Sequence, residues 1–211
     1  KYRIKYKYSL LSAKPNFEYT PESNIYYDSI FCFSNYDAEF LSVYAKTELM
    51  ENLKYNNFKR HLNQNSDKLT LLYLPTYGNV SSIEDVCNEL QTLKSKYHLI
   101  VKSHHGTTFL KNEINRISLL QKISDEYYDY TTPLVDLLEK ADVILSDNSG
   151  AIFESLYAKI PLAICSEKIN CNKLGNFNTI QYKLVQDGII PYSNKASDIE
   201  KLLNEALSEE Y

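Results

Sequence analysis

The densest group of polar and ionisable side chains lies at residues 102–108, which read Lys-Ser-His-His-Gly-Thr-Thr. His104 and His105 are two of the four histidines in the chain. An imidazole titrates near neutral pH, so a histidine at the end of a strand can take a proton from an attacking hydroxyl. Lys102 adds a cation that can face a phosphate. We therefore expect a catalytic histidine here, either His104 or His105, and the alternative is a structural histidine in a loop.

A second polar run at residues 146–150, Ser-Asp-Asn-Ser-Gly, leads directly into a helical pattern. Small residues allow a phosphate to approach a helix N-terminus, where the amide groups and the helix dipole favour negative charge. Ser149 adds a hydroxyl donor, and Glu154 can accept hydrogen bonds from both hydroxyls of a ribose. The alternatives are a helix cap for the run and, for Glu154, a carboxylate that complements the dipole.

A third cluster at residues 75–79, Pro-Thr-Tyr-Gly-Asn, precedes a predicted helix start near Ser82. Exposed backbone amides in this cluster could bind a phosphate, and the alternative is an ordinary turn. All three clusters follow apolar runs of strand length, and ligands bind at the carboxyl ends of parallel strands. Together the clusters predict a crevice for a phosphorylated, nucleotidyl ligand.

Alternating strand and helix patterns after residue 67 would position these clusters. Apolar runs of strand length occur at 69–74, 99–102, 143–145 and 161–165, and the tyrosine-rich segment 126–130 is a further candidate strand. Helical patterns open at Ser82 and Ser197, both with capping-box spacing, and at Pro133 and Gly150. Continuous apolar strands that alternate with helices indicate a parallel sheet covered on both faces. We therefore predict an α/β fold, a Rossmann-like parallel sheet with helices on both faces.

Residues 1–67 carry a weaker pattern and form a separate predicted region. Strands are predicted at 1–8 and 29–34, followed by a helix from Asn35. Residues 63–67 are polar, lack periodicity and are typical of a linker. We therefore expect domains at 1–67 and 68–211. The alternating Lys and Tyr residues at 1–8 favour a solvated strand face, with contact to anionic lipid as the alternative.

The composition argues against several classes of protein. The 211 residues are 44% hydrophobic and 24% charged with a net charge of −4, which is typical of globular proteins and argues against a nucleic-acid binder. No apolar run approaches the roughly 18–20 residues of a membrane span. Four cysteines without CxxC spacing argue against a zinc site and favour reduced thiols in the cytoplasm. The chain begins without Met, so we expect it to be part of a longer protein.

Three segments resemble the C-terminal half of the GT-B fold: LLYLPTYG (71–78), LIVKSHHG (99–106) and LVDLLEKADVILSDNSGAIFESLYAKIP (134–161). Within that fold they are most similar to the CDP-glycerol:poly(glycerophosphate) glycerophosphotransferases, the teichoic acid polymerase family. The resemblance implies a nucleotide-donor-binding C-terminal domain at 68–211 and a remnant of the N-terminal domain at 1–67. It also implies a metal-independent enzyme without a cofactor, whose nucleotide donor is a substrate.

The resemblance carries roles to single residues. His104 takes the position of the histidine in the family's Lys-x-His-Pro strand end, which implies a role near the donor pyrophosphate as base or phosphate-stabilising group. It implies donor binding by Thr76, Tyr77, Lys102, Asp147, Asn148, Ser149, Gly150 and Glu154. The sequence departs from the family pattern where Gly78 replaces an arginine, His105 a proline and Asn148 a tyrosine.

We interpret the chain as a transferase that moves glycerol or ribitol phosphate from a CDP-activated donor to a polymer or lipid-linked acceptor, in teichoic acid or capsule synthesis. Action at the inner face of the cell membrane, with peripheral association, stays open, and the sequence specifies no oligomeric state. One alternative is a GT-B glycosyltransferase or a UDP-sugar 2-epimerase-like enzyme, because SGAIFE (149–154) resembles an epimerase turn. Ser155 stands where that turn has a second glutamate. The other alternative is a non-catalytic domain of the same fold.

Overall fold

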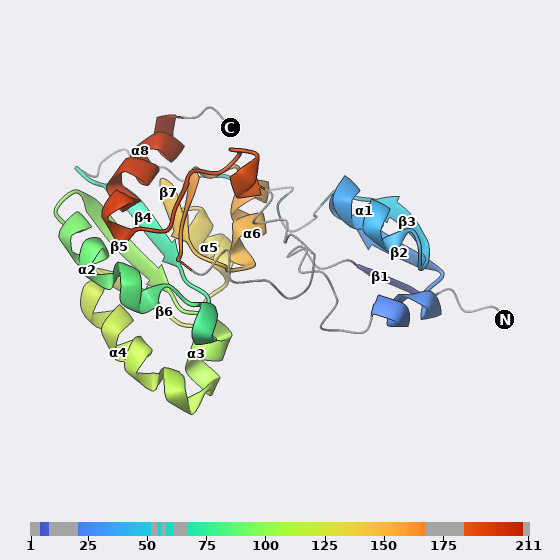
Figure 1. Ribbon diagram of the computed structural model, residues 1–211, viewed down its shortest axis with the longest axis horizontal. Coiled ribbons are helices and arrows are strands. Elements are labelled where there is room, and N and C mark those ends of the chain that lie inside the picture. Colours follow the sequence, from blue (N-terminus) through green and yellow to red (C-terminus); the bar gives the residue numbers. More distant parts are fainter. Residues whose placement is uncertain are drawn as a thin grey trace. The chain divides into compact units, whose positions relative to one another are not determined.

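The computed structural model describes residues 5–8, 21–51, 55, 58–60, 67–167 and 184–208. The chain divides into two compact units, Lys1–Asn57 and Phe58–Tyr211. All of the expected linker at 63–67 except Asp67 lies outside the described residues, as does the basic start of the chain up to Ile4. The second unit carries all three polar clusters (Figure 1).

The first unit contains a three-stranded parallel sheet in the order β1-β2-β3. Its small core is formed by the buried side chains of Ile30, Cys32 and Leu41. The strand predicted at 29–34 and the helix predicted from Asn35 are both present. The third strand was not expected, because its sequence Lys-Thr-Glu-Leu has no apolar run. The elements are β1 (Tyr6–Tyr8), the 3₁₀ helix η2 (Pro21–Tyr26), β2 (Ser29–Cys32), α1 (Asn35–Leu41) and β3 (Lys46–Leu49).

The second unit contains a six-stranded sheet in the order β6-β5-β4-β7-β8-β9, and all its strand pairs are parallel. The chain runs outward from β4 through β5 to β6 and then returns to place β7 on the other side of β4. This reversal is a topological switch point, where open α/β sheets bind ligands. The strands are β4 (Leu69–Leu74), β5 (Tyr97–Lys102), β6 (Glu126–Tyr128), β7 (Val143–Ser146), β8 (Leu162–Cys165) and β9 (Tyr192–Ser193).

Helices cover both faces of this sheet, as predicted. On one face, α2, α4 and α8 bury side chains such as Leu90, Leu120 and Leu202 against alternate residues of the strands. Figure 1 shows α5 and α6 on the other face. The helices are α2 (Ile83–Leu93), α3 (His105–Phe109), α4 (Ile114–Ile123), α5 (Leu134–Leu138), α6 (Ala151–Tyr157) and α8 (Ile199–Ser208), with short 3₁₀ turns η4 (Gly78–Val80), η5 (Lys111–Glu113) and η7 (Ala196–Asp198).

Candidate functional site

The three polar clusters follow β5, β4 and β7, which are neighbours in the sheet. The strand ends are also level with one another: Tyr73 pairs with Val101, and Leu74 pairs with Ser146. The Ser146 hydroxyl ties two of these ends together by donating to the Leu74 carbonyl at 2.8 Å. The clusters therefore lie along one edge of the sheet, beside the switch point between β4 and β7.

Asp147 joins the cluster after β7 to the loop after β4. Its side chain is fully buried. One oxygen accepts the Thr76 N–H at 2.8 Å, and the other accepts both the N–H and the hydroxyl of Ser82, at 3.0 and 3.1 Å. Burial raises the pKa of this carboxyl to about 6, although the hydrogen bonds from Ser82 and Thr76 counteract the rise. The carboxylate is thus committed to an internal network, so a phosphate would have to be met by other groups of this turn.

The same network changes the expected capping box at Ser82. Helix α2 begins at Ile83, as the pattern predicts, but the Ser82 side chain makes no cap hydrogen bond to it. The hydroxyl is instead bonded to Asp147, and Tyr73 Oη lies 3.1 Å from it. A hydrogen bond to a carboxylate is stronger than one between neutral groups, so Asp147 and not the helix end sets the orientation of the Ser82 hydroxyl. Burial and the nearby Asp147 charge raise the pKa of Tyr73.

Tyr77 and the two histidines form an aromatic cluster after β4 and β5. The rings of Tyr77 and His104 are stacked, with centroids 4.5 Å apart and planes 19° from parallel. His105 lies 3.9 Å from His104 and 6.2 Å from Tyr77, again between centroids. A Cβ added to Gly106 would lie 2.5 Å from Tyr77 Cδ2, so the glycine makes room for the tyrosine ring.

The segment around His104 is helical, whereas the sequence suggested a loop. His104 is the N-cap of α3, and its Nδ1 accepts the Gly106 N–H at 3.0 Å. A nitrogen that accepts a hydrogen bond carries no proton, so the neutral imidazole of His104 is protonated on Nε2. This tautomer makes Nε2 a hydrogen-bond donor, the form that suits contact with a phosphate oxygen.

Lys102 and Glu154 come from β5 and α6 but influence each other electrostatically. Burial lowers the pKa of Lys102, and the charges of Asp129 and Glu154 partly oppose this effect. The Lys102 ammonium also donates to the Asp129 carbonyl at 2.6 Å. Lys102, the predicted cation, and Glu154, the residue predicted to bind the ribose, are therefore near enough for their charges to interact.

The turn before α6 is buried more deeply than an exposed phosphate loop would be. Asn148 is 6% exposed and Ser149 is 4% exposed. The Ser149 hydroxyl accepts the Ala151 N–H at 3.3 Å, which is a capping contact. The cap that the sequence left as an alternative is thus present, and it leaves the Ser149 hydroxyl hydrogen available for donation.

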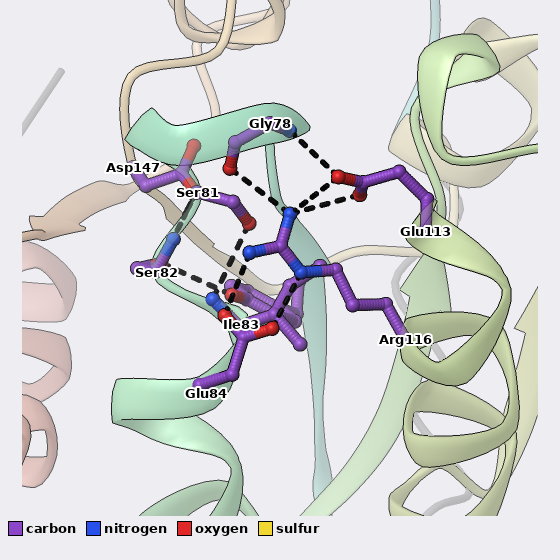
Figure 2. Close-up of polar contacts among 9 residues, drawn as sticks. Gly78, Ser81, Ser82, Ile83, Glu84, Glu113, Arg116 and Asp147 are labelled. Carbon is purple, nitrogen blue, oxygen red and sulfur yellow. Dashed lines mark hydrogen bonds and ion pairs between the residues drawn. The ribbon is translucent and has the colours of Figure 1, made fainter. Parts of the chain in front are cut away.

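Sequence reasoning missed Glu113 and Arg116, which hold the loop after β4. The Gly78 N–H donates to Glu113, and its carbonyl accepts from Arg116 (Figure 2). Together with the bonds to Asp147, these contacts occupy the amides of Thr76, Gly78 and Ser82. These three amides are therefore not available to a phosphate, which favours the alternative of an ordinary turn. The missed pair has i,i+3 spacing, which in a sequence is typical of a solvated helix face.

The described residues contain no group of three His, Cys, Asp or Glu side chains placed to hold a metal ion. No helix in the described part of the chain has the length and apolar character needed to cross a membrane.

No family model and no curated protein matches the sequence, whereas several solved structures resemble the fold. The wall teichoic acid polymerase TagF superposes with a TM-score of 0.60 at 15% identity, covering 92% of this chain and 54% of TagF. A TagF variant with one histidine replaced by alanine gives 0.59 at 16% identity with the same coverage. Another, with asparagine in place of a histidine and soaked with CDPG, gives 0.59 at 16% identity, covering 92% of this chain and 53% of that one.

The chain spans about half the length of the TagF structures that it matches. At such low sequence identity, the likeness establishes the fold. The chain therefore has the GT-B type of α/β fold found in the wall teichoic acid polymerase TagF, which is the fold that its motifs predict.

Proposed function

We propose that this chain binds the donor in a transferase that moves glycerol or ribitol phosphate from a CDP-activated donor to a cell-surface polymer. The fold shared with TagF supports a transferase, and one TagF structure was soaked with CDPG. The observation that carries the proposal is the double link through adjacent residues: the Thr76 amide binds Asp147 while the Tyr77 ring stacks on His104. This link connects the polar clusters of three strands at a switch point. The expected cytoplasmic location and independence from metals are part of the proposal.

The proposed donor contacts follow from charge and hydrogen-bonding capacity. Lys102 would meet the negative charge of the diphosphate, and Ser149 would donate its hydroxyl hydrogen to a phosphate oxygen. Glu154 would accept from the ribose hydroxyls, because a carboxylate has acceptor positions for two donors. Asn148 and Gly150 would line the approach to this turn.

The proposal assigns different catalytic roles to His104 and His105. His104, protonated on Nε2, would donate to an oxygen of the reacting phosphate and stabilise its developing charge. His105 would take the proton of the acceptor hydroxyl. The hydroxyl oxygen forms a bond to the β-phosphorus, the bond from that phosphorus to the bridging oxygen breaks, and CMP leaves with the electron pair.

Calorimetric titration of the whole chain with CMP, CDP, UMP and UDP tests this proposal. We expect the cytidine nucleotides to bind, and we expect Ser149→Ala and Glu154→Ala each to weaken that binding. Ser124→Ala, which removes an exposed hydroxyl at the end of α4, should leave it unchanged. Tighter binding of the uridine nucleotides would favour the nucleotide-sugar alternative. The absence of heat with all four nucleotides would contradict donor binding.

A further inference from the structure

The backbone of Gly78 is held by two charged side chains from the region of α4. Its N–H donates to Glu113 Oε1 at 3.2 Å, and its carbonyl accepts from Arg116 Nη1 at 2.9 Å. Gly78 has a φ of +71°, a left-handed conformation that glycine adopts without steric cost. Figure 2 shows the Gly78 carbonyl and the Glu113 carboxylate both bonded to the Arg116 guanidinium, while the Gly78 N–H is bonded to Glu113.

The two side chains that hold Gly78 are themselves fixed. Glu113 is 2% exposed, and both its carboxylate oxygens lie 2.8 Å from Arg116 Nη1. The other edge of the guanidinium makes a bidentate pair with Glu84 of α2, at 2.5 and 2.9 Å. Bidentate pairs between arginine and carboxylates fix geometry as well as charge. Arg116 therefore joins α2, α4 and the loop after β4 through one rigid group.

Tyr77 lies between two such anchored peptide groups. The N–H before it, from Thr76, donates to Asp147, and the N–H after it, from Gly78, donates to Glu113. Two carboxylates from different parts of the chain thus define the backbone on either side of this residue. The Tyr77 ring is consequently directed onto His104, above the space that Gly106 leaves open.

We infer that Glu113 and Arg116 are positioning residues, which hold the Tyr77 ring against His104 and so orient the imidazole toward the donor phosphate. This inference rests on the proposed function for its purpose, although the contacts that carry it do not depend on a ligand. Neither residue is expected to contact the donor, because Glu113 is engaged with Gly78 and Arg116, and Arg116 is also engaged with Glu84. Removing this support should loosen the stack before it unfolds the domain.

The first test observes His104 by NMR in the ligand-free chain. A stacked tyrosine ring shifts the carbon-bound protons of the imidazole, so Tyr77→Ala gives the position of these signals without the stack. We expect Glu113→Gln to move them toward that position, since a glutamine amide would face the Arg116 guanidinium with its own donors. Arg116→Lys serves as a second variant, because lysine lacks the fork that reaches both glutamates. Glu126→Gln, at the amino end of β6, is the matched control and should leave the signals in place. Signals that coincide with those of the native chain in both variants would overturn the inference.

The second test is a double-mutant cycle on CMP binding. Glu113→Gln should weaken binding about tenfold in the native chain, a loss typical of one supporting hydrogen bond. In the Tyr77→Ala background it should have almost no further effect, because residues that act through one another are not additive. The same factor in both backgrounds would overturn the inference. If the native chain binds no CMP, the proposed function fails, and the imidazole signals alone then decide whether the pair positions His104.

Discussion

Tyr77 lies flat on His104, with ring centroids 4.5 Å apart, although the two residues follow different strands of the sheet. The contact is possible because Gly106 has no Cβ, which would lie 2.5 Å from the tyrosine ring. The residue types at Tyr77, His104 and Gly106 therefore depend on one another.

Gly106→Ala should destabilise the protein by about 1–3 kcal/mol, because the new methyl group overlaps the Tyr77 ring. The measurement is the free energy of unfolding in urea. The substitution lies within α3, where alanine is otherwise favoured over glycine by about 1 kcal/mol. In the Tyr77→Ala background the overlap is gone, so Gly106→Ala should become neutral or stabilising there. Equal destabilisation in both backgrounds would show that the ring is not the obstacle.

Asp147 should make the free energy of unfolding depend on pH between about 4 and about 6. Its folded pKa of about 6 lies above the ordinary value of 3.8, because the carboxyl is buried. The folded state therefore binds more protons across this window, and its stability falls as pH rises through it, by on the order of 2–3 kcal/mol in total. Above the folded pKa, this contribution stays constant.

The measurement is the difference in free energy of unfolding between the native chain and Asp147→Asn, followed from pH 4 to pH 8. Carboxyls with lowered pKa values, such as Asp125 and Glu126, have the opposite dependence but are common to both proteins. The difference should therefore change between about pH 4 and pH 6 and level off above. Parallel curves would contradict a raised pKa at Asp147.

Thr107→Val should leave the protein as stable as before, or stabilise it by about 1 kcal/mol. Thr107 is fully buried, and its hydroxyl has no hydrogen-bond partner in the described part of the chain. Burying an unpaired hydroxyl costs about 1–3 kcal/mol, which the isosteric valine avoids. Ser146→Ala is the contrasting variant, because its equally buried hydroxyl donates to the Leu74 carbonyl, and it should lose stability. A destabilised Thr107→Val would indicate a partner for this hydroxyl.

For the proposed transfer reaction, His105→Ala and His104→Ala should differ in their pH–rate profiles, measured as CMP release from CDP-glycerol with an acceptor present. Loss of a general base costs about 10²–10⁴-fold in turnover and removes the corresponding limb of the profile. We expect this outcome for His105→Ala. His104→Ala should lose about 10²–10³-fold, as for one donor to a developing oxyanion, and keep that limb. Normal turnover in His104→Ala would contradict its role.

The sequence was most informative where strands are long and apolar. The runs at 69–74 and 143–145 predicted β4 and β7, because only a sheet buried on both faces requires such continuous apolar residues. Strands β3 and β9 were missed, because β3 has three polar residues among its four and β9 has only two residues, so neither contains such a run. Helix α3 was missed for a similar reason, because its five residues are too few to show a helical period.

The sequence predicted that the three polar clusters lie at one edge of the sheet, but it did not predict their hydrogen-bond partners. The clusters around Thr76, His104 and Asp147 meet because parallel strands end at one edge, which is a property of topology. The choice of Ser82 between a helix cap and Asp147 depends on a residue 65 positions away in the chain. The hydrogen bond to the Gly78 carbonyl likewise comes from Arg116, 38 positions further along the chain. Neither partner could be identified from local spacing.

The left-handed backbone at Gly78 restricts how the loop after β4 could change. An arginine there, as in the resembling family, would have to adopt a φ of +71°, which costs an L-residue roughly 1 kcal/mol or more. The backbone carbonyl at this position already accepts a hydrogen bond from Arg116, so the new arginine would also add a second positive charge to this loop. An arginine at position 78 would thus require the loop after β4 to change together with α4, because Glu113 and Arg116 both bond to the Gly78 backbone.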